Sequence, residues 1–299
     1  MTPAAIPPRQ LASAYLLLGL TTLFWAGNAV LARLLHAQIG PATLAFGRWA
    51  LATLILLPFA WPRLRSHRRE LLRNWPIVVV LALLGVSVFN TLLYQAAHTT
   101  TSNNIALIQT TMPAMIVILA GVLFGERVGA IGVLGVVLSM LGGVIVVIRG
   151  ELHALGTWAF RPGDLWMLLA TLDYALYSVM LRKRPSVHPL ALVGAIFLLG
   201  TLALLPVMIW EALTLGLPAP SPAIIGGLAY AAVFPSILSY LFWNRGVALV
   251  GASRAGFFIC LIPVFTAALS AALLGEALEW FHLVGLGLIV AGFLVFHRR

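Results

Sequence analysis

Residues 20–33 read LTTLFWAGNAVLAR and residues 169–182 read LATLDYALYSVMLR, with six identical positions in fourteen. Other windows repeat at nearly the same distance, 148–150 residues along the chain. Their matched positions are Pro41, Thr53 and Pro58 with Pro189, Thr201 and Pro206, and Pro113, Leu119, Leu123, Gly125 and Glu126 with Pro263, Leu269, Leu273, Gly275 and Glu276. One shift that covers all of these windows indicates that the chain is a duplicated unit.

The composition is that of a membrane protein. Hydrophobic residues make up 62% of the 299 positions and charged residues 9%, and the mean hydropathy is +1.04. Because a helix needs about 20 apolar residues to cross the hydrocarbon core, ten segments qualify as spans. They are residues 13–34, 41–61, 75–97, 101–124, 129–148, 163–183, 189–210, 221–245, 252–274 and 279–297. A β-barrel would alternate apolar and polar residues instead.

The spans divide five and five, which predicts two repeat units at residues 1–150 and 151–299. A unit with an odd number of spans is inverted in its second copy, because the chain enters that copy from the other side of the membrane. Inverted repeats are typical of transporters, with the substrate site at the repeat interface. We therefore expect an all-α integral membrane protein with ten transmembrane helices, arranged as two inverted five-helix repeats around a central cavity.

The basic residues predict which side of the membrane holds the chain ends. The formal net charge is +10, which in a soluble protein would suggest nucleic acid. With a cytoplasmic N-terminus, 14 of the 18 Lys and Arg residues fall on cytoplasmic segments, three fall outside and Arg48 lies within a span. Cytoplasmic loops carry an excess of Lys and Arg. The distribution thus predicts a multi-pass protein of the bacterial inner membrane, with both termini cytoplasmic and no nucleic-acid partner.

The sequence carries no motif that calls for a cofactor. Cys260 is its one cysteine, and no CxxC, HExxH or His/Cys cluster is present, so a metal site has no support. A P-loop is also missing, which excludes an ATP-driven pump in this chain. The spans hold neither a Ser/His/Asp set nor a pair of carboxylates. We therefore expect a protein without cofactors that is not an enzyme.

Small residues and prolines in the spans predict close packing and bends. In the first half, Gly135, Ser139 and Gly143 form a stripe of small residues at a spacing of four. Gly287 and Ala291 form a similar stripe in the second half. Such stripes let helix backbones approach each other in lipid, and here they indicate packing within a monomer, with a weak dimer face as the alternative. The matched Pro113 and Pro263 each remove a backbone hydrogen bond in mid-span, which predicts a kink or hinge.

One carboxylate stands out at bilayer depth. Asp173 is the only acidic residue well inside a span, and Tyr174 and Tyr177 lie beside it. An intramembrane carboxylate can bind an ammonium, relay a proton or pair with an arginine. Arg48 is the only well-embedded arginine. An Arg48–Asp173 ion pair is therefore the structural alternative to a substrate-binding role.

Aromatic and polar residues on other spans complete the predicted substrate-binding set. Helical spacing places the members of each span on or near one face. They are Trp25, Asn28, Tyr94, Gln95, His98, Asn104, Tyr240, Trp243 and Asn244. Under the repeat, Tyr94 corresponds to Trp243, so equivalent residues of the two halves would line the cavity. The alternatives are interfacial anchoring for Trp243 and a hydrogen-bonded loop position for His98.

Four segments of the chain carry a family resemblance. They read FWAGNAVLAR at 24–33, PATLAFGRW at 41–49, YQAAHTTTSNNIALIQTTMPAMIVILAGVLFGERV at 94–128 and GVALVGASRAGFFICLIPVFTAALSAALLGEAL at 246–278. Together they resemble the drug/metabolite transporter superfamily, EamA type, over nearly the whole chain. The resemblance implies a ten-helix exporter with a central cavity between its halves. Within the family the sequence is most similar to bacterial amino-acid exporters, including those of aromatic amino acids.

These observations predict a secondary transporter that exports small amphipathic metabolites, above all amino acids, by alternating access between the halves. Aromatic rings would contact apolar groups and an ammonium, and amides would bind the rest of the zwitterion. Its partners would be this small molecule and the lipid bilayer. A multidrug exporter of lipophilic cations, dependent on Asp173, is the alternative. An intramembrane enzyme or a structural scaffold is less well supported by the polar residues in the spans.

Overall fold

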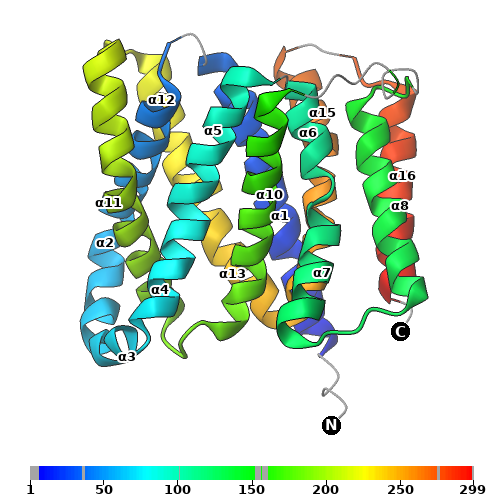
Figure 1. Ribbon diagram of the computed structural model, residues 1–299, viewed down its shortest axis with the longest axis horizontal. Coiled ribbons are helices and arrows are strands. Elements are labelled where there is room, and N and C mark those ends of the chain that lie inside the picture. Colours follow the sequence, from blue (N-terminus) through cyan, green and yellow to red (C-terminus); the bar gives the residue numbers. More distant parts are fainter. Residues whose placement is uncertain are drawn as a thin grey trace.

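The computed structural model describes residues 7–35, 38–100, 102–151, 156, 161–274 and 277–297. Every regular element in these ranges is a helix. Figure 1 shows the helices side by side as one bundle, in which α1 (Pro8–Leu35) begins and α16 (Trp280–His297) ends at the same face. We name this face the terminal face and the opposite one the distal face.

The helices follow the order that the duplication predicts. In the first half, α1 is followed by α2 (Pro41–Ser66), α3 (Arg68–Arg73), α4 (Trp75–Ala82), the π-helix η1 (Leu83–Val88), α5 (Phe89–Thr99), α6 (Ser102–Gln109), α7 (Met112–Phe124) and α8 (Ala130–Val147). The second half contains α10 (Pro162–Met180), the 3-10 helix η2 (Leu181–Lys183), α11 (Pro189–Leu215), α12 (Pro222–Ala231), the π-helix η3 (Ala232–Leu238), α13 (Ser239–Val250), α14 (Ala252–Gly256), the 3-10 helix η4 (Phe257–Cys260), α15 (Leu261–Leu274) and α16.

These elements make up a multi-pass membrane bundle. Within the described ranges, nine continuous or stacked helices are long and apolar enough to cross a membrane, and α16 is a shorter apolar helix. The all-α membrane fold is therefore confirmed. The helices run past the expected apolar segments, since α2 ends at Ser66 and α11 at Leu215.

Proline marks where many of the helices begin. The first residue is a proline in α1, α2, α10, α11 and α12. Proline is favoured at this position because its missing N–H has no intrahelical acceptor there and its φ angle is already helical. The prolines at these positions therefore act as start signals for the spans.

The pairing of α8 with α16 shows the inverted repeat at atomic level. A Cβ added to Gly135 would lie 2.6 Å from the carbonyl oxygen of Gly292, and one added to Gly142 would lie 2.5 Å from that of Gly285. Under a shift of 150 residues Gly135 corresponds to Gly285 and Gly142 to Gly292, so the two contacts are equivalent. Reciprocal contacts of this kind define a two-fold interface.

The same interface refines the predicted stripe of small residues. Ser139 lies at its centre and donates from Oγ to the carbonyl oxygen of its own repeat counterpart, Ile289, at 3.3 Å. Gly143 instead faces Thr110, and a Cβ on Gly287 would meet no atom within 4 Å. The stripe therefore packs within the chain as predicted, but through glycines spaced seven apart, because two full helical turns return to the same face.

A second point of the same symmetry lies between α2 and α11. The hydroxyl oxygens of Thr53 and Thr201 are 3.0 Å apart and share a hydrogen bond. These residues are matched positions of the duplicated sequence. A residue that bonds its own counterpart lies on the symmetry axis, so this axis passes between α2 and α11 as well as between α8 and α16.

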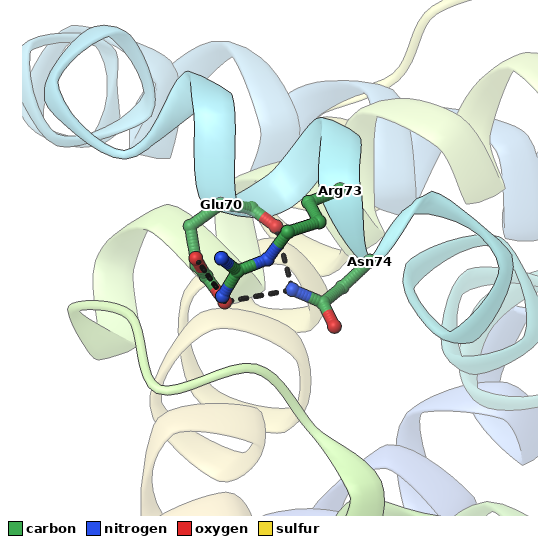
Figure 2. Close-up of polar contacts among 3 residues, drawn as sticks. All are labelled: Glu70, Arg73 and Asn74. Atoms are coloured by element: carbon green, nitrogen blue, oxygen red, sulfur yellow. Dashed lines mark hydrogen bonds and ion pairs between the residues drawn. The ribbon is translucent and has the colours of Figure 1, made fainter.

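A polar corner joins α3 to α4 at the terminal face. Arg73 Nη2 donates to Glu70 Oε1 at 2.7 Å, and Asn74 Nδ2 donates to the same carboxylate oxygen and to the Glu70 carbonyl oxygen at 2.8 Å each (Figure 2). Glu70 thus fixes the end of α3. The arginine-rich segment that the sequence predicts to be cytoplasmic lies at the same face as the start of α1 and the end of α16.

Candidate functional site

Aromatic side chains from both halves meet in the interior of the bundle. The ring of Trp25 on α1 lies 5.4 Å from that of Tyr174 on α10 and 5.3 Å from that of Trp243 on α13. The other rings join through centroid distances of 4.9 to 6.1 Å. We name the set the central cluster; its members are Trp25, Trp49, Phe89, Tyr174, Tyr177, Phe197, Tyr240 and Trp243.

The two π-helices position this cluster. η1 and η3 begin at corresponding positions of the repeat, 149 residues apart. A π-helix interrupts the regular i to i−4 bonding and leaves carbonyl groups available. The Tyr240 hydroxyl donates to the carbonyl oxygen of Gly85 in η1, and Trp25 Nε1 donates to that of Pro235 in η3 at 3.2 Å. Each half therefore holds an aromatic side chain of the other.

Six buried polar atoms around the cluster have no hydrogen-bond partner among the described residues. They are Arg48 Nε, Trp49 Nε1, Asp173 Oδ2, the Tyr174 hydroxyl, Trp243 Nε1 and Asn244 Nδ2. Leaving such a group unpaired costs about 1–3 kcal/mol, and native interiors rarely do so. Every buried unpaired side-chain atom that the described part of the structure contains belongs to a cluster residue or its sequence neighbour.

Tyr177 shows how one of these atoms is oriented. Its hydroxyl donates to Asn244 Oδ1 at 2.8 Å, which fixes the amide so that Nδ2 keeps both of its donors unused. Both residues are buried. The bond thus prepares the Asn244 amide to donate to a group that is not part of the protein.

The alternative ion pair of Arg48 with Asp173 is not formed, although the structure describes both side chains. Each retains only 7% of its surface exposed. Ion pairs between described residues join Arg73 to Glu70 and Arg182 to Glu126. Arg48 instead stacks on its neighbour Trp49, with Cζ 4.6 Å from the ring centroid. A basic and an acidic side chain therefore lie beside the central cluster without forming an ion pair with each other.

The structure places Asn104 away from the cluster. Asn104 Nδ2 donates to both carboxylate oxygens of Asp164 at 3.0 Å each, and the hydroxyl of Thr100 donates to the same carboxylate. Asp164 is buried in the first turn of α10, at the distal face (Figure 1). Asn104 thus has a strong contact that links the halves, and a substrate-binding role for it remains a prediction.

The remaining predicted residues lie around the cluster in different settings. Gln95 is exposed and Asn28 is half-buried, while the side chains of Tyr94 and His98 lie outside the described part of the structure. Pro113 is the second residue of α7, directly after the break that ends α6. Pro263 is the third residue of α15 and follows the 3-10 helix η4. Both prolines therefore adjoin an irregular segment, and their hinge role remains a prediction.

Sequence reasoning missed Trp49, Phe89 and Phe197 as members of the cluster. Trp49 and Phe197 are repeat counterparts, 148 residues apart, and their rings meet edge to face at 4.9 Å. Trp25 and Tyr174 are counterparts that also touch. Aromatic residues at matched positions of an inverted repeat are thus a signal that finds such contacts, whereas Phe89 corresponds to Leu238 and carries no such signal.

Two surface hollows lie away from the cluster. One of about 300 Å³ is lined by residues 149–151 and 279–281, and one of about 360 Å³ by residues 38–41, Glu211 and residues 215–218. Both lie at the distal face, where α8 and α11 end (Figure 1). In the interior the rings of the central cluster pack against one another, and the unpaired polar atoms lie around them.

Comparison with known proteins gives the family and the fold. A transporter of Bacillus subtilis (strain 168) named YyaM is 27% identical over 281 residues, 94% of this chain and 92% of that protein. A probable terminal-alkyne amino-acid exporter of Streptantibioticus cattleyicolor is 25% identical over 97% of this chain and 95% of its own length. A solved crystal structure superposes with a TM-score of 0.78 over 96% of both chains, at 20% identity.

The EamA-like transporter family matches the sequence twice, at residues 12–148 and 161–297. The two matches cover most of the chain and correspond to the two halves that the reciprocal glycine contacts relate. The duplication and the membrane bundle agree with this match. The chain therefore belongs to the EamA-like transporter family.

Proposed function

We propose that this protein is a secondary transporter that exports small amphipathic metabolites, above all amino acids, from the cytoplasm across a bacterial inner membrane. The observation that carries the proposal is the group of six polar atoms that are buried around the central cluster without a hydrogen-bond partner among the described residues. A buried site that combines aromatic surface with unused donors and a carboxylate suits a molecule with a polar end and an apolar body.

The proposal assigns a role to each part of the site. The rings of Trp25, Tyr174 and Trp243 contact the apolar body of the substrate, and the amide of Asn244 binds its polar end. Alternating access comes from rocking one half against the other about the interface between them. The termini face the cytoplasm, in accordance with the excess of Lys and Arg on that side.

A second candidate function is the export of lipophilic cations. It is favoured by Asp173, whose Oδ2 is buried next to aromatic rings without a partner among the described residues, because such a group attracts a cation. The amino-acid proposal draws additional support from the relative named as a probable amino-acid exporter, which is similar to this chain over nearly its full length.

The test is uptake of a panel of radiolabelled amino acids into proteoliposomes that contain the purified protein, with protein-free liposomes as the control. Saturable uptake of some amino acids, inhibited by others, is the expected result. Lipophilic cations are measured in the same vesicles. Uptake of the cations alone, with no amino acid transported, would replace the proposed function with the multidrug alternative.

A further inference from the structure

We infer that Arg48 binds the carboxylate of the transported molecule in the central cluster. The inference rests on the proposed function and deepens it, because it names the group on the substrate that the site selects. It assigns a role to a residue that the sequence suggested only as the partner of an ion pair.

The donors around the cluster outnumber the acceptors. Arg48 Nε, the indole nitrogens of Trp49 and Trp243, and Asn244 Nδ2 can only donate a hydrogen bond. The Tyr174 hydroxyl can donate or accept, and the single obligate acceptor among the unpaired atoms of the described residues is Asp173 Oδ2. A ligand that satisfies this set must present several acceptor atoms. A carboxylate, with two oxygens that accept up to four bonds, meets this requirement.

Arg48 adds a permanent positive charge to these donors. Its guanidinium cannot lose its proton in a protein, so burial at 7% exposure leaves a charge that needs an anion. No described carboxylate lies within ion-pair distance of it; the nearest ring contact is Trp49, at 4.6 Å from Cζ. Stacking on a tryptophan fixes the plane of the guanidinium and leaves its N–H edge free for bidentate binding of a carboxylate.

The neighbours of Arg48 define where the anion would sit. Arg48 stacks on Trp49, and the Trp49 ring meets that of Tyr240 at 5.0 Å. The Tyr240 hydroxyl is already bonded to the Gly85 carbonyl oxygen, whereas the Tyr174 hydroxyl of the same cluster is buried without a partner among the described residues. Tyr174 also packs against Trp25 and Trp243. A carboxylate at Arg48 would therefore place the rest of the molecule among these rings.

Asp173 gives the complementary requirement. It precedes Tyr174 on α10, and its Oδ2 is buried without a hydrogen-bond partner among the described residues. Since it makes no bond with Arg48, the site keeps a positive and a negative group apart. A zwitterion can neutralise both groups at once, whereas a lipophilic cation neutralises Asp173 and leaves Arg48 uncompensated. Arg48 thus selects amino acids over the cations of the multidrug alternative.

The experiment compares Arg48→Gln with Arg65→Gln in proteoliposomes. Arg65 is the matched control because it lies on the same helix and stacks on a tryptophan, with Cζ 5.4 Å from the Trp61 ring, but it is exposed at the terminal face. The probes are phenylalanine, 3-phenylpropionate, which lacks the ammonium, and phenethylamine, which lacks the carboxylate. Uptake of radiolabelled phenylalanine is measured alone and with each analogue as competitor.

We expect Arg48→Gln to lower phenylalanine uptake by about tenfold or more, as for the loss of a hydrogen bond to a charged group, and to abolish inhibition by 3-phenylpropionate. Inhibition by phenethylamine persists in Arg48→Gln, measured on the uptake that remains, and Arg65→Gln transports phenylalanine like the unaltered protein. Phenylalanine uptake by Arg48→Gln at the unaltered rate would overturn the inference, as would loss of inhibition by both analogues together.

A second measurement uses only the unaltered protein and decides the matter if Arg48→Gln does not fold. Inhibition by 3-phenylpropionate is compared with inhibition by 3-phenylpropionamide, in which a neutral amide replaces the carboxylate. Inhibition by the acid alone supports carboxylate binding, and equal inhibition by both overturns it. Failure of the proposed function has a different signature, because the unaltered protein then transports no amino acid in the panel.

Discussion

Trp25 and Trp243 lie with their ring centroids 5.3 Å apart, yet they differ in what their indole N–H groups do. Trp25 Nε1 donates to the Pro235 carbonyl oxygen, whereas Trp243 Nε1 is buried without a partner among the described residues. One tryptophan therefore uses its donor within the protein. The other keeps it for a group that the protein does not supply, so the two positions should respond differently to the loss of the N–H.

Replacing Trp243 with Phe should lower transport and cost less stability than replacing Trp25 with Phe. Both changes lose the packing of the larger ring, but Trp243→Phe removes a donor that has no partner among the described residues, and transport falls by about two- to tenfold through loss of one hydrogen bond to substrate. Trp25→Phe should lower stability by about 1 kcal/mol more, because the Pro235 carbonyl oxygen loses its donor. Thermal unfolding in detergent at one scan rate and uptake in proteoliposomes measure the two effects.

Trp210→Phe is the control for both substitutions, since Trp210 is 66% exposed on the outer surface of α11. It should change neither uptake nor unfolding. Equal transport by Trp243→Phe and the unaltered protein would show that this N–H does not contact substrate, whatever its effect on stability.

The pairing of α8 with α16 depends on backbone contact between glycines. Lipid is as apolar as a leucine side chain, so helices in a membrane associate where small residues let their backbones meet. The glycines of α8 and α16 satisfy this condition from both sides of the pair. A single added methyl group therefore acts against the carbonyl of the partner helix, which cannot move aside as a side chain can.

Gly142→Ala should destabilise the protein by about 1–3 kcal/mol, the usual range for overpacking. The added Cβ would lie 2.5 Å from the Gly285 carbonyl oxygen. Gly287→Ala is the matched control on the facing helix, because its Cβ would meet no atom within 4 Å and alanine favours the helix. Unfolding of the two variants at the same temperature would contradict the observed pairing of α8 with α16.

The start of α2 is held by a carboxylate from the other half. Glu211 accepts hydrogen bonds from the backbone N–H groups of Ala42 and Thr43, at 2.9 and 2.7 Å, and from the Thr43 hydroxyl at 2.7 Å. A negative charge at a helix N-terminus is favourable because it faces the positive end of the helix dipole. Glu211 is 5% exposed, so water cannot readily replace it.

Glu211→Ala should therefore lower the stability by about 2–3 kcal/mol, since it leaves buried donors without an acceptor. The control is Glu279→Ala, which removes an exposed carboxylate at the same distal face. The measurement is the unfolding midpoint of the two variants at one scan rate. Glu211→Gln should lie between Glu211→Ala and the unaltered protein, because an amide oxygen can still accept but carries no charge. A Glu211→Ala midpoint equal to that of Glu279→Ala would count against this cap.

At the scale of the whole molecule, the duplication made the fold predictable from sequence. Matched residues such as Thr53 and Thr201 indicated two copies, and the odd number of spans in each copy required the inversion. The site was less predictable, because it forms where the halves meet and pairwise contacts across that interface leave little trace in one sequence. Asn104 illustrates this difficulty, since its partner Asp164 lies in the other half. The π-helices were not expected. The extra residue that each one adds lies in an apolar run, and its residue types do not distinguish it from the rest of the span.

Polar contacts that join the halves occur at both faces, but they differ in strength. At the terminal face, Arg182 Nη1 donates to Glu126 Oε1 at 2.7 Å, and the two side chains are 56% and 40% exposed. Exposed pairs of this kind contribute about 0–1 kcal/mol. At the distal face, Asp164 is 2% exposed and accepts bonds from Thr100 and Asn104. A buried carboxylate with several donors is worth considerably more.

If the halves rock as proposed, the distal face should be held closed more strongly than the terminal face. We expect Asp164→Asn to raise hydrogen–deuterium exchange about tenfold or more at the distal ends of α5 and α10, with little change at the terminal face. Glu126→Gln should raise exchange near the α7–α8 connection and η2 by about fivefold at most, in line with a contribution below about 1 kcal/mol. Because each contact network lies at one face, its loss should raise hydrogen–deuterium exchange at that face first. An equal rise in exchange at both faces, in either variant, would mean that the two networks do not act as separate closures. The difference in burial between the networks would then not determine which side opens.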